Sequence, residues 1–128
     1  MNDWHLDFFE CLAADAETGP SVCKIGGWVK EPFAIDRRRY FDPYDDTCES
    51  GWVVTHLPTG YCALGVVGRR EVAQEIVGEL LAIADWDFVD IAAVKAVAPA
   101  VRVLMKRRPE IRNPAHFDVA LWLDGGKS

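Results

Sequence analysis

The sequence predicts an α+β fold, in which helices flank a small antiparallel sheet, and three stretches of the chain indicate it. Residues 52–67 have the pattern of a tight β-hairpin, residues 69–84 have the period of an amphipathic helix, and residues 3–17 place their acids on one helical face. We therefore expect an N-terminal helix, a small antiparallel sheet centred on residues 52–67, and C-terminal helices packed on one face of that sheet.

The hairpin is the clearest of these elements. Residues 52–57 are rich in β-branched and aromatic side chains, and residues 61–67 return as a second strand. Between them, Pro58 sets φ for the first corner of the turn, and Gly60 accepts the positive φ that closes a bulged type I turn. Gly68 then interrupts the strand before the helix begins.

The N-terminal segment has a helical charge pattern. When residues 3–17 are spaced at about 100° per residue, four acids fall on one side and the apolar residues occupy the wide remainder. Gly19 and Pro20 would end such a helix. The acids that define the pattern are Asp3, Asp7, Glu10 and Glu17.

The next segment is extended but irregular. Residues 22–25 and 33–35 are short strand candidates, and Gly26-Gly27 indicates a turn between them. Pro32 restricts any strand there to a sheet edge or a bulge. Residues 42–51 have the composition of a loop that leads into the hairpin.

The C-terminal half is predicted to be helical. Val72, Ile76 and Leu80 repeat every four positions in the first helix. A second helical region covers residues 90–107, where Pro99 predicts a break near Ala98 and the start of a new helix. Residues 115–123 fit a short helix, which we prefer, although their apolar residues also alternate as in a strand.

Length and composition indicate one globular domain over residues 1–128. Half of the residues are hydrophobic, so a packed core is expected. The apolar runs are shorter than the roughly 20 residues that cross a bilayer, and the acidic beginning of the chain differs from a signal peptide. We therefore expect a cytoplasmic protein, with no membrane contact.

Motifs for catalysis or for a cofactor do not stand out. The cysteines lack the close pairs of a zinc site, and the phosphate-binding glycine motifs are missing. His56 and Cys62 flank the hairpin turn and could form a Cys–His pair oriented by Asp45 or Asp46, but the surrounding residues match no cysteine hydrolase. We expect His56 to be a half-exposed strand residue, and we expect no enzyme activity, cofactor or metal.

The acidic loop is the predicted partner-binding element. The net charge is −6, and residues 42–49 hold four acids without a base. Close like charges repel, so either a basic partner or the nearby arginines of this chain must relieve them. We predict a protein partner with a basic surface, contacted by Asp42, Tyr44, Asp45, Asp46 and Glu49.

The alternative is nucleic-acid binding. Arg37, Arg38 and Arg39 form one basic run, and residues 102–112 hold five bases against one acid. Aromatic neighbours of the first run would suit base stacking. The overall acidity of the chain disfavours this alternative, because nucleic-acid binders present a dominant basic face.

The segment W-x-V-T-H-x-P-T-G, followed by a charged helix start and an aliphatic helix, resembles a hairpin–helix module of small proteins from phages and other mobile elements. The resemblance covers about 40 residues of the 128. It implies an accessory protein, and such proteins include anti-CRISPR inhibitors. Our leading hypothesis is therefore a non-enzymatic protein-binding protein that inhibits a host nucleic-acid-handling defence complex.

Overall fold

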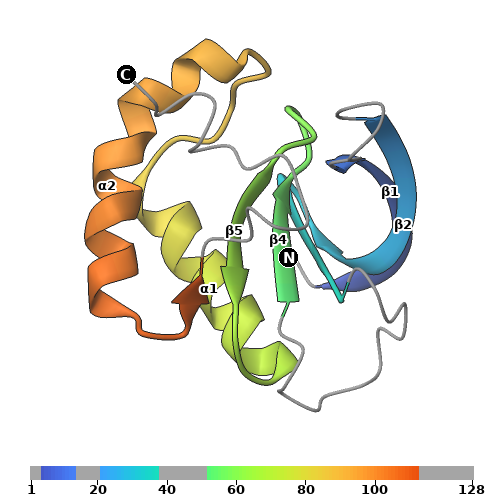
Figure 1. The fold of residues 1–128 in the computed structure, drawn as a ribbon, viewed down its shortest axis with the longest axis horizontal. Helices are drawn as coiled ribbons and strands as arrows, with labels where there is room; N and C mark the ends of the chain where they lie inside the picture. Colours follow the sequence, from blue (N-terminus) through green and yellow to red (C-terminus); the bar gives the residue numbers. More distant parts are fainter. Residues whose placement is uncertain (1–3, 14–20, 38–51, 113–128) are drawn as a thin grey trace.

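The computed structural model describes residues 4–13, 21–37 and 52–112 (Figure 1). Within these ranges strands come first and helices follow, and a short strand comes after the helices. The elements are β1 (His5–Ala13), β2 (Ser21–Lys30), β3 (Phe33–Asp36), β4 (Trp52–His56), β5 (Cys62–Val66), α1 (Arg70–Ile83), the 3-10 turn η1 (Ile91–Ala93), α2 (Val94–Arg107) and β6 (Ile111–Arg112).

The described strands form one antiparallel sheet in the order β1-β2-β3-β4-β5-β6, so each strand pairs with its neighbour in the sequence. The sheet is strongly curled (Figure 1). The Leu12 N–H of β1 donates to the Gly60 carbonyl oxygen at 2.7 Å, although Gly60 lies in the β4–β5 turn. Strands three places apart in a flat sheet are separated by roughly 14 Å. The β1–β2 hairpin must therefore roll over one face of the sheet.

The predicted hairpin is confirmed. β4 and β5 pair antiparallel, with a bulge between Val54 and Thr55. The turn is closed by hydrogen bonds from the His56 N–H to the Tyr61 carbonyl and from the Gly60 N–H to the His56 carbonyl. Gly60 has a φ of +78°, as the turn chemistry requires.

The predicted N-terminal helix is wrong, because His5–Ala13 is the edge strand β1 and pairs with β2 along its whole length. The strand separates the apolar residues that a helix would have grouped. Phe9 and Cys11 are buried on one face, whereas Leu6 and Phe8 are 38% and 69% exposed on the other. The helical spacing of the acids was coincidental, since long-range pairing with β2 decides the conformation.

The predicted turn at Gly26-Gly27 is also wrong, since both glycines lie inside β2. They lie where β2 passes close to atoms of the neighbouring strands, not where the chain reverses direction. A Cβ on Gly27 would overlap the Ile35 carbonyl oxygen of β3, and a Cβ on Gly26 would lie 3.3 Å from the Phe8 ring. The chain instead turns at residues 31–32, so Pro32 stands outside the strands.

The helix after the hairpin is confirmed as α1, but the predicted break near Ala98 is wrong. α2 continues through Pro99 from Val94 to Arg107. A proline inside a helix removes a hydrogen bond to the carbonyl four residues earlier, here that of Lys95. Both residues are exposed, so water can satisfy this carbonyl and the helix survives.

Two apolar clusters lie on opposite faces of the curled sheet. The larger packs both helices against β3, β4 and β5, which confirms that the helices cover one face. Its most buried large side chains include Trp52, Phe33, Leu64, Ile76 and Leu80. The smaller cluster lies inside the curl of β1 and β2 and contains Phe9, Cys11, Ile25, Val29 and Ala34.

Two predicted elements lie outside the described residues, namely the loop over 42–51 and the helix over 115–123. Among the helices that the structure describes, none is long and apolar enough to cross a membrane.

Replacing Gly27 with alanine is expected to lower the free energy of unfolding by about 1–3 kcal/mol, because the added methyl group forces β2 away from β3. The matched control is Gly78→Ala in α1, where a Cβ would have nothing within 4 Å. Alanine there is expected to raise the free energy of unfolding by about 0.5–1 kcal/mol. Urea unfolding measures both variants, and a Gly27→Ala protein as stable as the native one would contradict the close packing of β2 on β3.

Candidate functional site

A hollow of about 440 Å³ opens where three connections meet. These are the β2–β3 turn, the β4–β5 turn and the connector from α1 to α2, together with the last turn of α1. The β4–β5 turn and the start of α2 lie at the same end of the molecule (Figure 1). The residues that line the hollow are Glu31, Pro32, Pro58, Leu81, Ala84, Asp85, Trp86 and Asp87.

Backbone and indole hydrogen bonds hold the walls of the hollow together. The Leu57 N–H in the β4–β5 turn donates to the Pro32 carbonyl in the β2–β3 turn at 2.8 Å. On the other side, Trp86 Nε1 donates to the Leu80 carbonyl at 2.7 Å, which fixes the connector to the end of α1. The hollow is therefore bounded by segments in defined positions.

His56 joins the two sides. Its side chain is fully buried, its Nε2 lies 2.9 Å from the Trp86 carbonyl oxygen, and its Nδ1 lies 3.0 Å from Thr59 Oγ1. A carbonyl oxygen only accepts, so Nε2 must carry a proton. In the neutral ring Nδ1 is then an acceptor. The single Thr59 hydroxyl proton has two acceptors within reach, Nδ1 at 3.0 Å and the His56 carbonyl oxygen at 3.3 Å, and the shorter distance favours Nδ1.

Aromatic packing surrounds the same imidazole. The ring centroid of His56 lies 4.6 Å from that of Phe88, 5.6 Å from Phe33 and 5.7 Å from Trp86. Phe33 and Trp86 also meet edge to face at 4.9 Å. His56 thus connects the sheet to the connector through both hydrogen bonds and ring contacts.

Burial lowers the pKa of His56 from its ordinary value, although the hydrogen bond to the Trp86 carbonyl raises it. The charged ring would lose water that the aromatic neighbours do not replace. The neutral form therefore dominates at neutral pH, which agrees with the tautomer that the hydrogen bonds require.

The rim of the hollow is acidic. Glu31, Asp85 and Asp87 are exposed, and the lining includes no lysine, arginine or histidine. Asp85 Oδ1 accepts the Asp87 N–H at 3.0 Å, which orders this part of the rim. Between the carboxylates, the walls are largely apolar. This combination suits a cation on an apolar stem, as in the side chains of lysine and arginine.

The Cys–His pair considered from the sequence does not form. The register places Cys62 opposite Thr55, so Cys62 and the next residue on β4, His56, belong to opposite faces of the strand. Cys62 Sγ donates to the Leu64 carbonyl instead. The expectation that His56 is half-exposed is wrong, because the connector covers it. Among the described residues, no three His, Cys, Asp or Glu side chains are grouped to hold a metal ion.

The partner-binding residues predicted from the sequence, Asp42, Tyr44, Asp45, Asp46 and Glu49, lie outside the described residues, as do Arg38 and Arg39. Arg37 is described, and its guanidinium is buried with its centre 5.5 Å from the Trp52 ring. Arg37 therefore belongs to the interior and does not extend a basic surface. Sequence reasoning missed the hollow because its acids come from two distant segments; the D-W-D triplet at 85–87 was the available signal.

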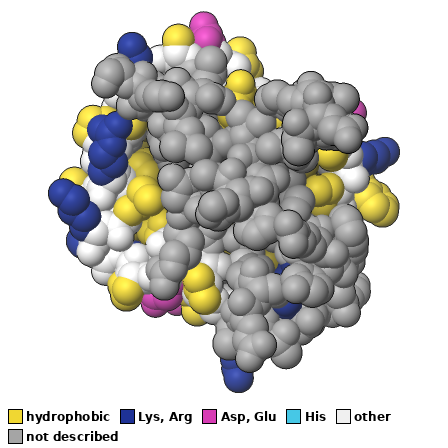
Figure 2. All heavy atoms as spheres, in the orientation of Figure 1, with side chains coloured by type: hydrophobic (Ala, Val, Ile, Leu, Met, Phe, Trp, Pro, Cys, Tyr) yellow, Lys and Arg dark blue, Asp and Glu magenta, His cyan; other side chains and the backbone are white. Residues whose placement is uncertain are grey.

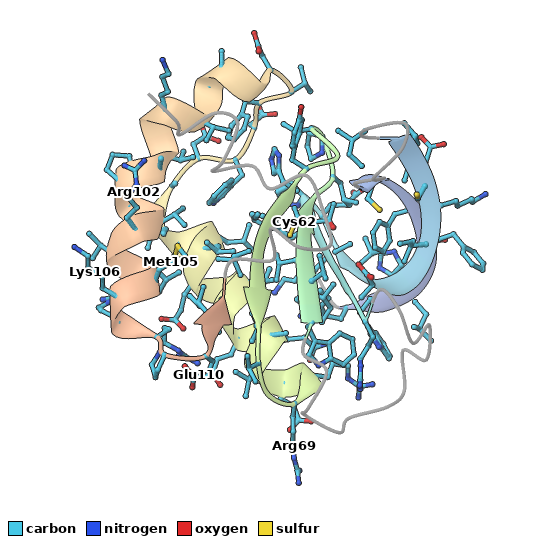
Figure 3. The ribbon with its side chains drawn as sticks, viewed as in Figure 1. Cys62, Arg69, Arg102, Met105, Lys106 and Glu110 are labelled. Atoms are coloured by element: carbon cyan, nitrogen blue, oxygen red, sulfur yellow. The ribbon has the colours of Figure 1, made fainter. Side chains whose placement is uncertain are left out.

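Bases of the segment over residues 102–112 lie in part on the exposed side of α2. Lys95, Arg102 and Lys106 are exposed at positions that share one helical face. Figure 2 shows basic side chains on the side of the molecule where α2 lies, and Figure 3 labels Arg102 and Lys106 there. Arg108 is different, because its guanidinium pairs with Glu79 at 2.6 Å, Glu75 at 3.2 Å and Glu110 at 3.3 Å. Arg108 thus fastens the end of α2 to α1.

Comparison with known proteins gives no relative for this chain: no family model matches it, and neither a curated protein nor a solved structure does.

The buried neutral His56 predicts a dependence of stability on pH. Because its pKa is lower in the folded protein than the value of 6.5 for an exposed histidine, the unfolded chain takes up the proton first as pH falls. The contribution of His56 is complete above about pH 6.5 and is lost progressively below it, as pH approaches the folded pKa.

Urea unfolding at several pH values between neutral and mildly acidic measures this effect. His56→Gln keeps a donor for the Trp86 carbonyl but does not titrate, so the difference between native and variant stability should shrink as pH falls. Parallel profiles for the native protein and His56→Gln would show that His56 is not buried as a neutral ring.

Proposed function

We propose that this chain is a non-enzymatic binding protein of the phage or mobile-element type, and that its partner is a protein with a basic surface. The observation that carries the proposal is the acidic hollow at Glu31, Asp85 and Asp87, whose apolar walls would receive a lysine or arginine side chain. Proteins that handle nucleic acids present such side chains, so inhibition of a host defence complex is the activity that fits.

Shape and charge are both needed for this binding. An ion pair on an exposed surface contributes only about 0–1 kcal/mol, since water and salt screen it. An apolar wall adds contact with the methylene stem of the incoming side chain, at about 25 cal/mol for each Å² removed from water. Pro32, Pro58 and Leu81 provide this wall.

The fixed position of the connector also favours the hollow as a binding site. The His56–Trp86 and Trp86–Leu80 hydrogen bonds fix the connector before a partner arrives, so less conformational entropy is lost on binding. The carboxylates would repel nucleic-acid phosphates, which favours a protein partner at this site. The loop residues 42–49 remain a second predicted contact.

The direct test uses a capped Gly-Arg-Gly peptide and its citrulline counterpart, which has the same shape without the charge. We expect weak, saturable binding of the arginine peptide, observed as shifts of the Trp86 indole N–H and the Asp85 and Asp87 amides in ¹H–¹⁵N spectra. The citrulline peptide should leave these signals in place. Equal shifts with both peptides, or none with either, would contradict the proposal.

A set of charge variants tests the same site against the partner itself. Glu31→Gln, Asp85→Asn and Asp87→Asn together should abolish arginine-peptide binding and capture of a partner from host extract. The matched control removes equal charge from the exposed acids Glu10, Glu71 and Asp90 as Gln, Gln and Asn, and should retain both. Loss of capture in both sets would indicate a response to net charge alone, against a specific hollow.

A second candidate function is nucleic-acid binding through the basic side of α2. The observation that favours it is that residues 94–107 contain four bases and no acid. Val103, which follows Arg102 on α2, is 58% exposed. Basic side chains on one helix face can contact successive phosphates.

Nucleic-acid binding predicts a salt-sensitive mobility shift with a generic DNA duplex or RNA. Lys95→Ala with Lys106→Ala should remove the shift, while Lys24→Ala with Arg69→Ala, which removes equal charge from other exposed positions, should preserve it. Our main proposal predicts no shift for the native protein. A shift that depends on Lys95 and Lys106 would replace the main proposal with this second function.

A further inference from the structure

We propose that Cys11 and Cys23 are a reversible disulfide site that a small disulfide such as oxidised glutathione forms by thiol exchange. The two residues are directly opposite each other in the β1–β2 hairpin. No disulfide joins the cysteines that the structure describes, so this is the reduced state of the pair. The proposal does not depend on the acidic hollow or on α2.

The strand register supplies the geometry. Directly opposed residues of an antiparallel pair have Cα atoms about 4.5 or 5.5 Å apart, depending on the hydrogen-bond pattern. Both values lie within the range of about 4.4–6.8 Å that disulfides span. Opposed side chains also point to the same face of the sheet, so the two Cβ atoms face each other.

Packing confirms that the two thiols share a face. Cys11 belongs to the smaller apolar cluster, and Cys23 packs against that cluster. Phe9 and Ile25, the next opposed pair on the same face, are buried in it as well. Neighbours on both strands therefore limit the side-chain motion that would separate the sulfur atoms.

Their unequal burial indicates an order of reaction. Cys11 is 2% exposed, whereas Cys23 is partly accessible. The thiolate of Cys23 attacks one sulfur of oxidised glutathione, forms a mixed disulfide and releases one glutathione thiolate. Cys11 then loses its proton and attacks the Cys23 sulfur, and the second glutathione leaves as a thiolate that takes up a proton. Two protein thiols are oxidised while one small disulfide is reduced to two thiols.

The bond would fasten the edge strand β1 to the rest of the sheet. Among the described strands β1 pairs with β2 alone, and on its other side the Leu12 N–H bonds to the Gly60 carbonyl in the β4–β5 turn, so β1 is an edge strand that this turn contacts at one end. A covalent link at Cys11 limits opening of this hairpin and restricts the unfolded chain, which raises stability.

Cys62 is the internal reference for the test. It is 1% exposed, and the residue opposite it is Thr55, so the sheet offers it no disulfide partner. Cleavage by trypsin separates the proposed disulfide pair from the reference cysteine. The peptide of residues 1–24 contains Cys11 and Cys23, and the peptide of residues 40–69 contains Cys48 and Cys62.

The experiment incubates the native full chain in glutathione buffers of increasing oxidised fraction, blocks remaining thiols with N-ethylmaleimide, and measures the tryptic peptides by mass spectrometry. We expect the peptide of residues 1–24 to lose both thiols together, without a glutathione adduct, while Cys62, located by fragmentation of the peptide of residues 40–69, keeps its N-ethylmaleimide label. Cleavage before Asp15 should leave the two halves of the oxidised peptide joined.

Two further measurements separate the steps. In Cys11→Ser the Cys23–glutathione adduct should persist, because the attacking thiol is missing. The oxidised native protein should also melt at a higher temperature than the reduced protein. A peptide of residues 1–24 that keeps both thiols in fully oxidised glutathione, or a native protein that stops at the Cys23 adduct, would overturn the proposal.

Discussion

The hydrogen bond from the buried His56 imidazole to the Trp86 carbonyl is the interaction on which the rest of the site depends. It joins the end of β4 to the connector between α1 and α2, which ring contacts with Phe33 and His56 also hold against the sheet. The indole N–H of Trp86 in turn donates to the Leu80 carbonyl, which attaches the same connector to α1. Because Nδ1 is occupied by Thr59, the imidazole satisfies both polar atoms inside an aromatic cluster. The T-H-x-P-T-G stretch therefore has a structural role: His56 and Thr59 hold the connector in place, and Pro58 contributes to the wall of the hollow.

The curl of the sheet is the second constraint, and it explains why the buried apolar residues that the structure describes form two separate clusters. Gly27 lets β2 approach β3 closely, and the bulge after Val54 adds local twist to β4 and β5. The β1–β2 hairpin rolls until Leu12 reaches Gly60, which encloses the smaller cluster. On the other face of the sheet, α1 and α2 pack against β3, β4 and β5. The fold also separates charges of opposite sign: acidic side chains lie around the hollow, and basic side chains lie along the outer side of α2.

Local chemistry predicted some elements well and long-range pairing decided the others. The hairpin and α1 were predictable, because turn residues at 58–60 and the four-residue apolar repeat act within a few positions. β1 was not, since its acids happen to follow a helical spacing and only its register with β2 makes it a strand. The break predicted at Pro99 was wrong for a related reason, because Lys95 is exposed, so water can satisfy its carbonyl and α2 continues.

His56 was expected near the surface because nothing in the neighbouring sequence reveals that residues 86–88 fold over it. The acidic hollow was equally hidden, as Glu31 and Asp85 meet only after folding.

The tautomer of His56 tests this account most directly, because it reports the hydrogen bond that positions Trp86. Long-range ¹H–¹⁵N correlation spectra of the ¹⁵N-labelled protein at neutral pH distinguish protonated from unprotonated ring nitrogens. We expect a neutral ring that carries its proton on Nε2, with Nδ1 as a hydrogen-bonded acceptor. A proton on Nδ1 with a bare Nε2 would contradict it, since the Trp86 carbonyl has no proton to donate.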